Sequence, residues 1–476
     1  MTLQNATKNR LTFSTKLAYG LASLGTATIS SIYAALLPIF YQDYLGLSSK
    51  WIGIASIIYA VWNALNDPIF GFITDNTRSK MGRRIPYMRF TAPFLALTFI
   101  LVWFAPEGAG DIAQFWWMLV TMLLYDTAYT IIGLVHGALM PELTESDVER
   151  NQLSISSAVF GLIGYVFGFL LPDLFRPRPG SMDTSLLSLQ LSMVAVGIIG
   201  AFFIIWTTLK VKERREFAIV DKPLKFWESL KYTLTNKPFW VFASMNFLLT
   251  LMNSMATGAI FYLADYVTQT STMILMVYLF APLALGIPVA NLVVKRYGLV
   301  RAQLLYLIIA GGGLVSLAFV PTSLIPISLA IAGLGLSGQQ TITYNILALV
   351  IDADEVQTGT RREGSFFGAN ALLTKPAQSI SLFLTAFILE QSGFITRAMN
   401  GGQIFINQPE AALFGIRSIV GLIPGSAMLI SAIILLFFPL QGERLAALKA
   451  KILTMHAEKE ARLAEIESEA PGSTPA

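Results

Sequence analysis

The 476-residue chain contains no cysteine and only two histidines, His136 and His456. The absence of cysteine excludes disulfide bridges, thiolate metal sites and cysteine nucleophiles. Two histidines far apart in the sequence do not favour a metal site built from several imidazoles. We therefore expect neither a metal centre nor another cofactor.

Charged residues are also scarce. They make up 13% of the chain, against roughly 25% in soluble domains, whereas 54% of the residues are hydrophobic. Apolar runs of about 20 residues, long enough to cross a bilayer, recur along the whole length. The polar stretch Met1 to Lys16 lacks the apolar core of a cleavable signal peptide. The composition predicts an all-α membrane protein.

Hydropathy predicts about 12 membrane spans. They are expected at residues 17–43, 51–75, 86–105, 114–140, 153–173, 187–209, 238–268, 272–295, 301–320, 324–351, 364–391 and 411–439. A charged linker at 210–237 separates six spans from six. We therefore expect an amino-terminal bundle (1–209), a carboxy-terminal bundle (238–440) and a charged tail (441–476) that forms an amphipathic helix.

The distribution of basic residues predicts the orientation. If the amino terminus is cytoplasmic, 27 of the 33 Lys and Arg residues fall on the cytoplasmic side, five on the opposite side and Lys375 within the membrane. Cytoplasmic loops of membrane proteins carry the excess of Lys and Arg. We therefore expect a multi-pass protein of the plasma (inner) membrane, with both termini, the linker and the tail in the cytoplasm.

The most informative stretch runs from Asn63 to Arg89. Asn63, Asp67, Gly71 and Asp75 recur at four-residue spacing, which places them on one face of a helix. Asp67 lies inside a hydrophobic run, where a carboxylate is costly unless it meets a cation, a proton or a partner. A buried acid followed by a basic elbow between two spans is typical of a coupled membrane transporter. The alternative is that Asp67 is a structural hydrogen-bond acceptor.

Two further charges lie deep in predicted spans. Asp126 is near the middle of span 114–140, and Lys375 is more than ten residues into span 364–391. That depth is roughly 15 Å at about 1.5 Å per residue, which is long for a lysine that snorkels to the surface. We expect Lys375 to pair across a cavity with Asp67, Asp126 or both. Snorkelling of Lys375 and a helix–helix hydrogen bond of Asp126 are the alternatives.

The stretch around Asp67 resembles a known family. Gly71-xxx-Asp75 followed by Gly82-Arg83-Arg84 resembles the loop motif of the major facilitator superfamily. A fuller pattern is similar to the glycoside–pentoside–hexuronide:cation symporters, the family of the melibiose carrier. This pattern comprises Asn66-Asp67-Pro68, Gly71, Asp75, Thr77-Arg78, Gly82-Arg83-Arg84 and Pro86.

An internal echo supports two homologous halves. Glu142 is followed eight residues later by Arg150 after the fourth predicted span, and Asp354 is followed eight residues later by Arg362 after the tenth. Repeated halves of this kind are typical of major facilitator transporters. The resemblance therefore implies the major facilitator fold, in which two six-helix bundles surround a central cavity.

The resemblance also implies roles for individual residues. Asp67 matches an acid that binds the cation in the family, and Lys375 matches a lysine near that site. The other acids and the sugar-stacking tryptophan of the melibiose carrier are replaced here by Ala27, Asn63, Gly133 and Gly137. One carboxylate is a poor cage for Na⁺ but an adequate proton acceptor. We expect Asp67, Asp126, Asn63 and Lys375 to couple transport to H⁺, with Na⁺ as the alternative.

Polar side chains recur at helical spacing in several other spans. Those expected to line a substrate cavity are Thr26, Tyr33, Tyr129, Thr130, Asn253, Gln340 and Tyr344. The alternative is that they form hydrogen bonds between helices. The charged elbows are expected to gate the cytoplasmic side, through Gly71, Asp75, Arg83, Arg84, Glu142, Arg150, Asp354 and Arg362. A role in setting topology alone is compatible with these charges.

These features predict a secondary active transporter that performs cation-coupled symport of a sugar or glycoside by alternating access. A symporter of lysophospholipids or other amphiphiles with the same fold is the first alternative, and a non-transporting receptor or scaffold is the second. The chain shows no nucleophile–base cluster or phosphate-cradling loop, so we do not expect an enzyme. The expected partners are a small-molecule solute and the lipid bilayer, without nucleic acid, and we expect a monomer.

Overall fold

The computed structural model describes residues 11–77, 79, 81–82, 84–143, 147–177, 186–211, 233–358, 363–401, 403–448, 450–452 and 454–455. Every regular element in these residues is a helix. The first half contains α2 (Phe13–Pro38), α3 (Ser49–Asn76), α4 (Ile85–Val102), α5 (Asp111–Leu143), α6 (Asp147–Phe175) and α7 (Leu187–Lys210). The second half contains α10 (Lys237–Tyr262), α11 (Thr272–Tyr297), α12 (Leu299–Ser316), α13 (Ile325–Thr358), α14 (Glu363–Gln391), α15 (Glu410–Arg417) and α16 (Ile423–Leu436). Most of the predicted linker and of the predicted tail helix lies outside the described residues.

Short segments extend some of these helices. The π-helical segments η1 (Ile39–Tyr44) and η2 (Leu263–Thr268) continue α2 and α10, and η5 (Ser418–Leu422) joins α15 to α16. Two short 3-10 turns, η3 (Thr322–Leu324) and η4 (Ala398–Asn400), lie in connections of the second half.

Eleven helical segments of the described chain are long and apolar enough to cross a membrane. Each coincides with a predicted span, and the 28-residue α3 covers the remaining one, 51–75. The predicted all-α membrane class is therefore confirmed.

Polar side chains mark where several of these helices begin. The hydroxyl of Thr12 accepts from the main-chain N–H of Thr15 at the start of α2. The side chain of Asn236 accepts from Phe239 N at 3.1 Å at the start of α10. Such caps satisfy N–H groups that have no partner within the helix. Between α11 and α12, Gly298 turns the chain with a φ of +83°, a conformation that favours glycine.

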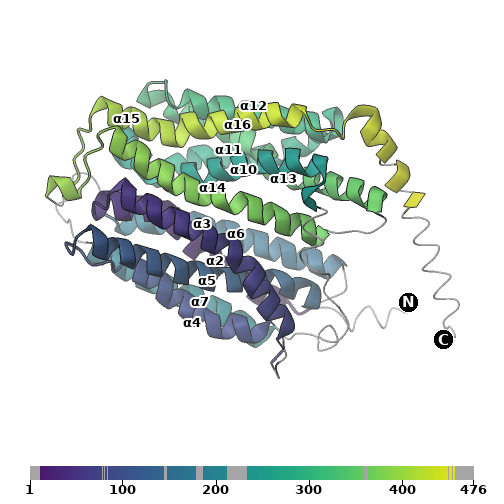
Figure 1. Ribbon diagram of the computed structural model, residues 1–476, viewed down its shortest axis with the longest axis horizontal. Coiled ribbons are helices and arrows are strands. Elements are labelled where there is room, and N and C mark those ends of the chain that lie inside the picture. Colours follow the sequence, from purple (N-terminus) through teal and green to yellow (C-terminus); the bar gives the residue numbers. More distant parts are fainter. Residues whose placement is uncertain are drawn as a thin grey trace.

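The two halves repeat one packing pattern (Figure 1). In the first half, α2 packs against α6 and α7, α4 against α5 and α7, and α3 against α5. In the second half, α10 packs against α14 and α16, α12 against α13 and α16, and α11 against α13. In chain order, the helices α2 to α7 correspond to α10, α11, α12, α13, α14 and α16. When each helix of the first half is replaced by its counterpart, the first set of contacts becomes the second. The chain is therefore built from two bundles of the same design.

The halves meet mainly along α3 with α14 and along α2 with α10, and only slightly along α6 with α11. We call the end of the molecule that holds the start of α2 and the end of α16 the proximal end. The opposite end, which holds η1, η2 and α15, is the distal end.

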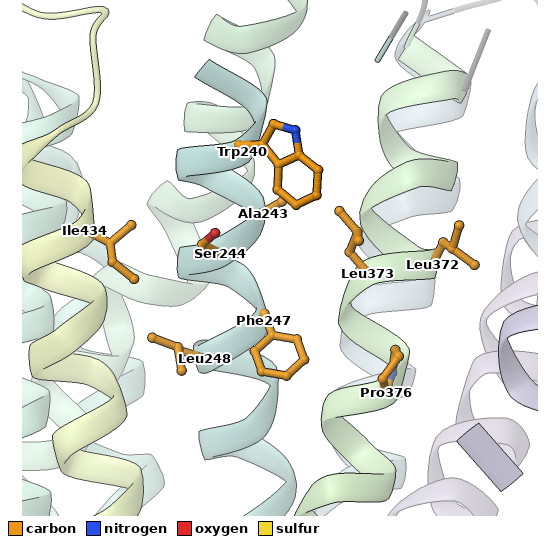
Figure 2. A pocket seen from close by; sticks show the side chains of 9 residues that line it. All are labelled: Trp240, Ala243, Ser244, Phe247, Leu248, Leu372, Leu373, Pro376 and Ile434. Atoms are coloured by element: carbon orange, nitrogen blue, oxygen red, sulfur yellow. The ribbon is translucent and has the colours of Figure 1, made fainter. Parts of the chain in front are cut away.

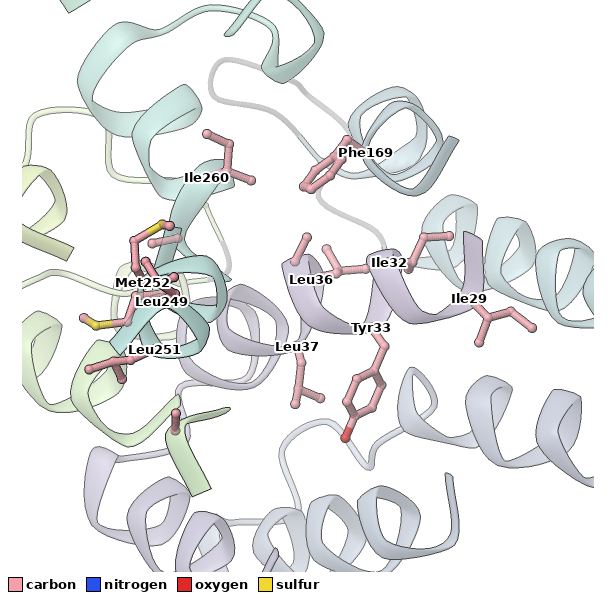
Figure 3. Close-up of a cluster of buried hydrophobic side chains, with 14 of the residues drawn as sticks. Ile29, Ile32, Tyr33, Leu36, Leu37, Phe169, Leu249, Leu251, Met252 and Ile260 are labelled. Carbon is pink, nitrogen blue, oxygen red and sulfur yellow. The ribbon is translucent and has the colours of Figure 1, made fainter. Parts of the chain in front are cut away.

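Helix α2 lies at the junction of the halves and divides its side chains between two surroundings (Figure 3). Ile32 and Leu36 point toward Phe169 of α6, whereas Tyr33 and Leu37 point to another side of the helix. Gly25 lets the same helix approach α7 closely, because a Cβ there would lie 2.8 Å from the main-chain oxygen of Gly200. Close contact through small residues is usual between helices in membranes.

Candidate functional site

A cavity of about 380 Å³ lies where the two halves face each other. The first half contributes Ser30, Ser31, Tyr33, Ala34, Leu37 and Pro38 of α2, Tyr59 and Asn63 of α3, Met122, Tyr125, Asp126, Tyr129 and Thr130 of α5, and Tyr165 of α6. The second half contributes Asn253, Ser254, Thr257 and Gly258 of α10 and Lys375, Gln378, Ser381, Leu382 and Thr385 of α14. The volume falls within the range of roughly 300–1,000 Å³ found for small-molecule sites.

An ion pair crosses between the halves beside this cavity. The ammonium nitrogen of Lys375 lies 2.5 Å from Oδ1 of Asp67, and the two side chains are only 19% and 29% exposed. Lys375 also donates to the main-chain oxygen of Asn63 at 3.2 Å. One residue of α14 thus holds two residues of α3 that stand one helical turn apart. The expected pairing of Lys375 is formed with Asp67, and its alternative, a lysine that snorkels to the surface, is not observed.

Asp126 is held in a different way. Its carboxylate is 5% exposed and accepts from the hydroxyl of Tyr59 at 3.0 Å and from Nδ2 of Asn66 at 2.8 Å. Both donors are uncharged and both belong to α3. The same pair of helices is joined again where the indole N–H of Trp62 donates to Thr127 at 3.0 Å. Asp126 therefore braces α5 against α3, the hydrogen-bonded alternative to a direct ion pair with Lys375, and its side chain still faces the cavity.

Three tyrosines form a stack in the wall of the first half. The ring centroids of Tyr33 and Tyr125 lie 4.0 Å apart, and those of Tyr125 and Tyr129 lie 5.9 Å apart. The hydroxyls of Tyr33 and Tyr125 are buried and make no hydrogen bond with the described protein. Tyr125 was not singled out by the sequence, because its place in the stack depends on how α2 and α5 are rotated against each other.

The structure brings together some of the residues expected to contact substrate. Tyr33, Tyr129, Thr130 and Asn253 line the cavity, and so do Asn63, Asp126 and Lys375. Three others do not line it: Thr26, Gln340 and Tyr344. The hydroxyl of Thr26 donates to Ala22 O of its own helix at 3.0 Å. Gln340 is exposed, and Tyr344 is exposed with its ring stacked on Phe367.

The expected gating residues are only partly described. Arg84 is buried and donates to the hydroxyl of Thr74 at 3.1 Å, which ties the start of α4 to the last part of α3. Asp354 is buried near the end of α13, and Gly71 faces open space. The side chains of Asp75, Glu142 and Arg150, and the whole of Arg83 and Arg362, lie outside the described residues. Their expected role stays a prediction.

Five charged residues that the sequence did not single out are buried at the distal end: Asp43, Asp173, Arg176, Asp265 and Arg397. We call them the distal charge cluster. Arg176, just after α6, donates to Asp173 at 3.0 Å and forms an ion pair with Asp265 of η2. Burial acts to lower the pKa of the Arg176 guanidinium, but the carboxylates of Asp265 and Asp173 outweigh it and the pKa rises above its ordinary value. Arg176 therefore stays charged.

The distal charge cluster joins the two halves. Asp43 of η1 accepts from the hydroxyl of Tyr266 at 2.5 Å and from the main-chain N–H of Arg397 at 2.7 Å. Nearby, Glu390 of α14 accepts from the main-chain N–H of Ser49 at 2.6 Å. These donors and acceptors come from opposite halves, so the halves are tied together at the distal end.

A second hollow has a different chemistry. It is an apolar groove of about 470 Å³ between α10, α14 and α16, lined by residues such as Phe247, Leu248, Leu372 and Pro376 (Figure 2). Although the groove is larger than the central cavity, it offers no ionisable side chain. We therefore take the central cavity as the candidate site. No group of three or more His, Cys, Asp or Glu that could hold a metal ion occurs in the described residues.

Comparison with known proteins agrees with this architecture. A mutant form of the nucleoside transporter NupG superposes with a TM-score of 0.65 at 12% identity, covering 89% of this chain and all of that chain. The D-xylose–proton symporter superposes with a TM-score of 0.63 at 12% identity, covering 90% of this chain and 97% of that one. These likenesses confirm the major facilitator fold.

Related sequences are symporters and importers. A symporter of Synechocystis is 26% identical over 92% of this chain and 96% of its own length. A putative sulfoquinovose importer of Salmonella typhimurium is 25% identical over 90% of each chain. The sodium-dependent lysophosphatidylcholine symporter 1 of Gallus gallus is 22% identical over 92% of this chain and 88% of its own.

The family model described as MFS/sugar transport protein matches residues 18–442, which is most of the chain. Together with the helices long enough to span a bilayer, this match makes the chain a multi-pass membrane protein of the transporter class. The chain belongs to the MFS/sugar transport protein family, which corresponds to the glycoside–pentoside–hexuronide:cation symporters that its motifs resemble.

Proposed function

We propose that the protein is a secondary active transporter that couples the movement of a cation, H⁺ in the first place, to the symport of a sugar or glycoside. The observation that carries this proposal is the ion pair between Asp67 and Lys375, which joins the two halves beside the cavity. Because this ion pair joins the two halves, a change in its charge when the site is occupied can change how the halves are held together.

The coupling step follows from electrostatics. A proton on Asp67 removes the negative charge that holds Lys375, so the attraction between α3 and α14 weakens. When the cation leaves, the pair forms again and permits the empty carrier to reorient. A ligand shifts such an equilibrium only by its different affinity for the two states. The pair supplies that difference, because it is intact only when the cation is absent.

The choice of H⁺ over Na⁺ rests on the ligands at this point. Among the described residues, Asp67 is the only carboxylate that forms an ion pair with Lys375, and the main-chain oxygen of Asn63 is already bound by that lysine. Na⁺ needs several oxygen ligands, whereas a proton needs one carboxylate. Na⁺ remains the alternative coupling ion, and no other cofactor is proposed.

The lining favours a sugar over an amphiphile. Hydroxyl, amide and tyrosine side chains make up most of the cavity wall. A lysophospholipid needs an apolar trench for its acyl chain, and the apolar groove lies on another face of α10 and α14. The lysophosphatidylcholine symporter among the relatives keeps the amphiphile as the alternative substrate. A receptor or scaffold without transport has no need for the ion pair, and an enzyme has no catalytic group to use here.

The proximal end holds the start of α2, the end of α16 and the described part of the loop between α3 and α4, and we propose that it faces the cytoplasm because the positive-inside rule assigns the segments that flank these elements to that side. We propose a monomer in the plasma membrane whose partners are the bilayer and a small solute, without nucleic acid. With the distal end tied together, the structure then corresponds to a carrier closed to the outside.

Proteoliposomes containing the full chain test this function. Radiolabelled sugars and glycosides are offered with an inward proton gradient, with an inward sodium gradient and with neither. We expect accumulation of at least one sugar that depends on the proton gradient. Saturable binding without flux would favour the receptor, and flux of lysophosphatidylcholine without flux of any sugar would favour the amphiphile symporter.

A further inference from the structure

The apolar groove between α10, α14 and α16 interrupts the repeat of the two halves. Gly164 of α6 and Pro376 of α14 are counterparts in the two halves. Each stands 14 residues after the basic residue of its charged elbow, Arg150 or Arg362. A Cβ on Gly164 would lie 2.6 Å from the main-chain oxygen of Leu24, so α6 and α2 are in direct contact there. Pro376 instead lines the groove of about 470 Å³ (Figure 2). The second half is therefore open at a place where the first half is packed.

The groove faces the bilayer. Its wall on α16 is Ile434, and the neighbouring Ile430, Ile433 and Leu436 of the same helix are exposed. An exposed apolar face on a helix that spans a membrane is covered by lipid chains. Ser244 is the only hydroxyl-bearing residue that lines the groove, and none of the lining residues is charged. Because water needs several polar partners to stay in such a place, a hydrocarbon chain suits this groove better than water does.

The groove has about the depth of one leaflet. Along α10 it runs from Trp240 to Leu248, which is roughly 12 Å at about 1.5 Å per residue. Half of a hydrocarbon core of about 30 Å is roughly 15 Å. Since α10 continues into η2 at the distal end, the start of α10 lies at the proximal end. The groove therefore lies in the proximal leaflet.

Trp240 marks the proximal end of the groove. Its indole N–H donates to the main-chain oxygen of Leu234 at 2.7 Å, which holds the ring just inside the start of α10. Tryptophan is enriched at the level of the lipid headgroups, where its ring is apolar and its N–H is satisfied. The groove thus begins at the depth where an acyl chain leaves its headgroup.

A cation stands beyond that end of the groove. Lys237 precedes Trp240 by three residues and Ser244 by seven, a spacing that places all three on one face of α10. Lys237 is exposed and forms no ion pair with a described residue. A basic side chain at this depth attracts the negative charge of lipid headgroups. The groove and Lys237 together fit the two parts of a phospholipid, an acyl chain and a phosphate.

We propose that the apolar groove is a binding site for a phospholipid of the proximal leaflet, with one acyl chain between α10 and α14 and the phosphate beside Lys237. Pro376 in the groove wall directly follows Lys375, whose side chain lines the central cavity. A bound chain therefore supports the turn of α14 that forms the ion pair with Asp67. The lipid site is separate from the central cavity and does not depend on the transported solute.

Native mass spectrometry of the purified full-length protein tests this site. Phosphatidylglycerol is titrated into the protein in detergent, and a diacylglycerol with the same two acyl chains is titrated in parallel. We expect one phosphatidylglycerol molecule to be retained more tightly than any further one. The diacylglycerol lacks the phosphate, so it should bind roughly fivefold more weakly.

A variant that fills the groove connects this binding to its walls. Ser244→Phe places a ring in the groove, and we expect phosphatidylglycerol to bind at least about tenfold more weakly, because the loss of about two buried methylenes already has this effect. Ala195→Phe is the matched control, since it adds the same ring at an exposed position of α7 that does not line the groove. It should leave the affinity unchanged.

A second variant tests the headgroup. Lys237→Gln should weaken phosphatidylglycerol binding roughly fivefold and leave diacylglycerol binding unchanged. Lys210→Gln is its matched control. Lys210 is also an exposed lysine at the proximal end of a helix, 5.4 Å from the centroid of the Trp206 ring, but it does not line the groove.

Equal affinity for phosphatidylglycerol in wild type and in folded Ser244→Phe would overturn the lipid site. If Ser244→Phe does not fold, the lysine variants decide, and equal affinity in Lys237→Gln and Lys210→Gln would overturn it. Equal binding of phosphatidylglycerol and diacylglycerol by the wild type would also contradict the placement of the phosphate beside Lys237.

Discussion

At the scale of single residues, the sequence predicted the charges better than their partners. The depth of Lys375 in its span indicated a buried cation that needs an acid, and the four-residue spacing of Asn63 and Asp67 indicated one helical face. The choice between Asp67 and Asp126 stayed open, because it depends on the rotation of α3 and α5 about their axes. In the structure Tyr59 and Asn66 donate hydrogen bonds to Asp126, and Lys375 forms its ion pair with Asp67. A sequence alone does not show which carboxylate accepts a hydrogen bond from a given tyrosine or asparagine.

Substitution of the coupling acid should separate exchange from accumulation. Asp67→Asn keeps the size of the side chain and removes its proton-binding charge. We expect this variant to exchange labelled for unlabelled sugar across the membrane but to leave equal concentrations on both sides. The measurement is counterflow and gradient-driven uptake in the same proteoliposomes. Normal accumulation against a gradient would refute the role of Asp67.

Removal of the lysine should destabilise the protein through its stranded partner. An isolated charge at the bilayer centre costs at least about 2.5 kcal/mol on insertion scales, so we expect Lys375→Ala to melt roughly 2–5 °C lower in detergent. The double variant Lys375→Ala with Asp67→Asn should recover most of that loss. Lys375→Ala with Asp126→Asn is the matched control and should not recover it, because Asp126 is held by Tyr59 and Asn66. If both double variants regained the same melting temperature, Lys375 would stabilise the charges of both Asp67 and Asp126.

At the scale of elements, the spans were predictable and the connection at the distal end was not. Each long apolar run became a helix within a few residues of its expected bounds. The distal charge cluster instead joins segments that are 89 and 354 residues apart in the sequence, as in Arg176 with Asp265 and Asp43 with Arg397. Its only local signal was the spacing of Asp173 and Arg176, three residues apart at the end of a span. Such spacing also occurs in ordinary surface ion pairs.

Breaking the distal charge cluster should open the distal end. Removing one member of a buried ion pair costs about 3–5 kcal/mol, and Arg176→Ala removes the guanidinium that pairs with both Asp173 and Asp265. In this cysteine-free chain, a single Thr257→Cys reports access to the cavity. We expect Arg176→Ala to raise its labelling by an impermeant maleimide applied from the distal side at least about tenfold.

Arg417→Ala is the matched control for this experiment. Arg417 is also a distal arginine, but it donates to Val320 O at 2.6 Å and to Thr322 at 2.9 Å within its own half. Its removal should leave the labelling of the cavity cysteine unchanged. Equal labelling in wild type and Arg176→Ala would show that the cluster does not keep the distal end closed.

At the scale of the whole molecule, the sequence predicted the repeat of two homologous halves, because in each half the fourth span is followed by an acidic and then a basic residue. The structure repeats the helix contacts of one half in the other, as those elbows indicated. The sequence did not predict at which end the carrier is closed. Which end is closed depends on cross-half contacts such as Ser49 with Glu390, and the same sequence must form and break them in each cycle.

The orientation of the whole molecule gives the last prediction. Most Lys and Arg residues belong to the proximal loops, the linker and the tail, and translocation of such loops is disfavoured. A single Ser79→Cys, in the exposed loop between α3 and α4, should therefore resist an impermeant maleimide applied to intact cells and react after the membrane is opened. A single Met399→Cys is the matched control, since Met399 is 75% exposed in η4 at the distal end and should react in intact cells. The reverse pattern would place the proximal end outside, and the distal charge cluster would then close the carrier toward the cytoplasm.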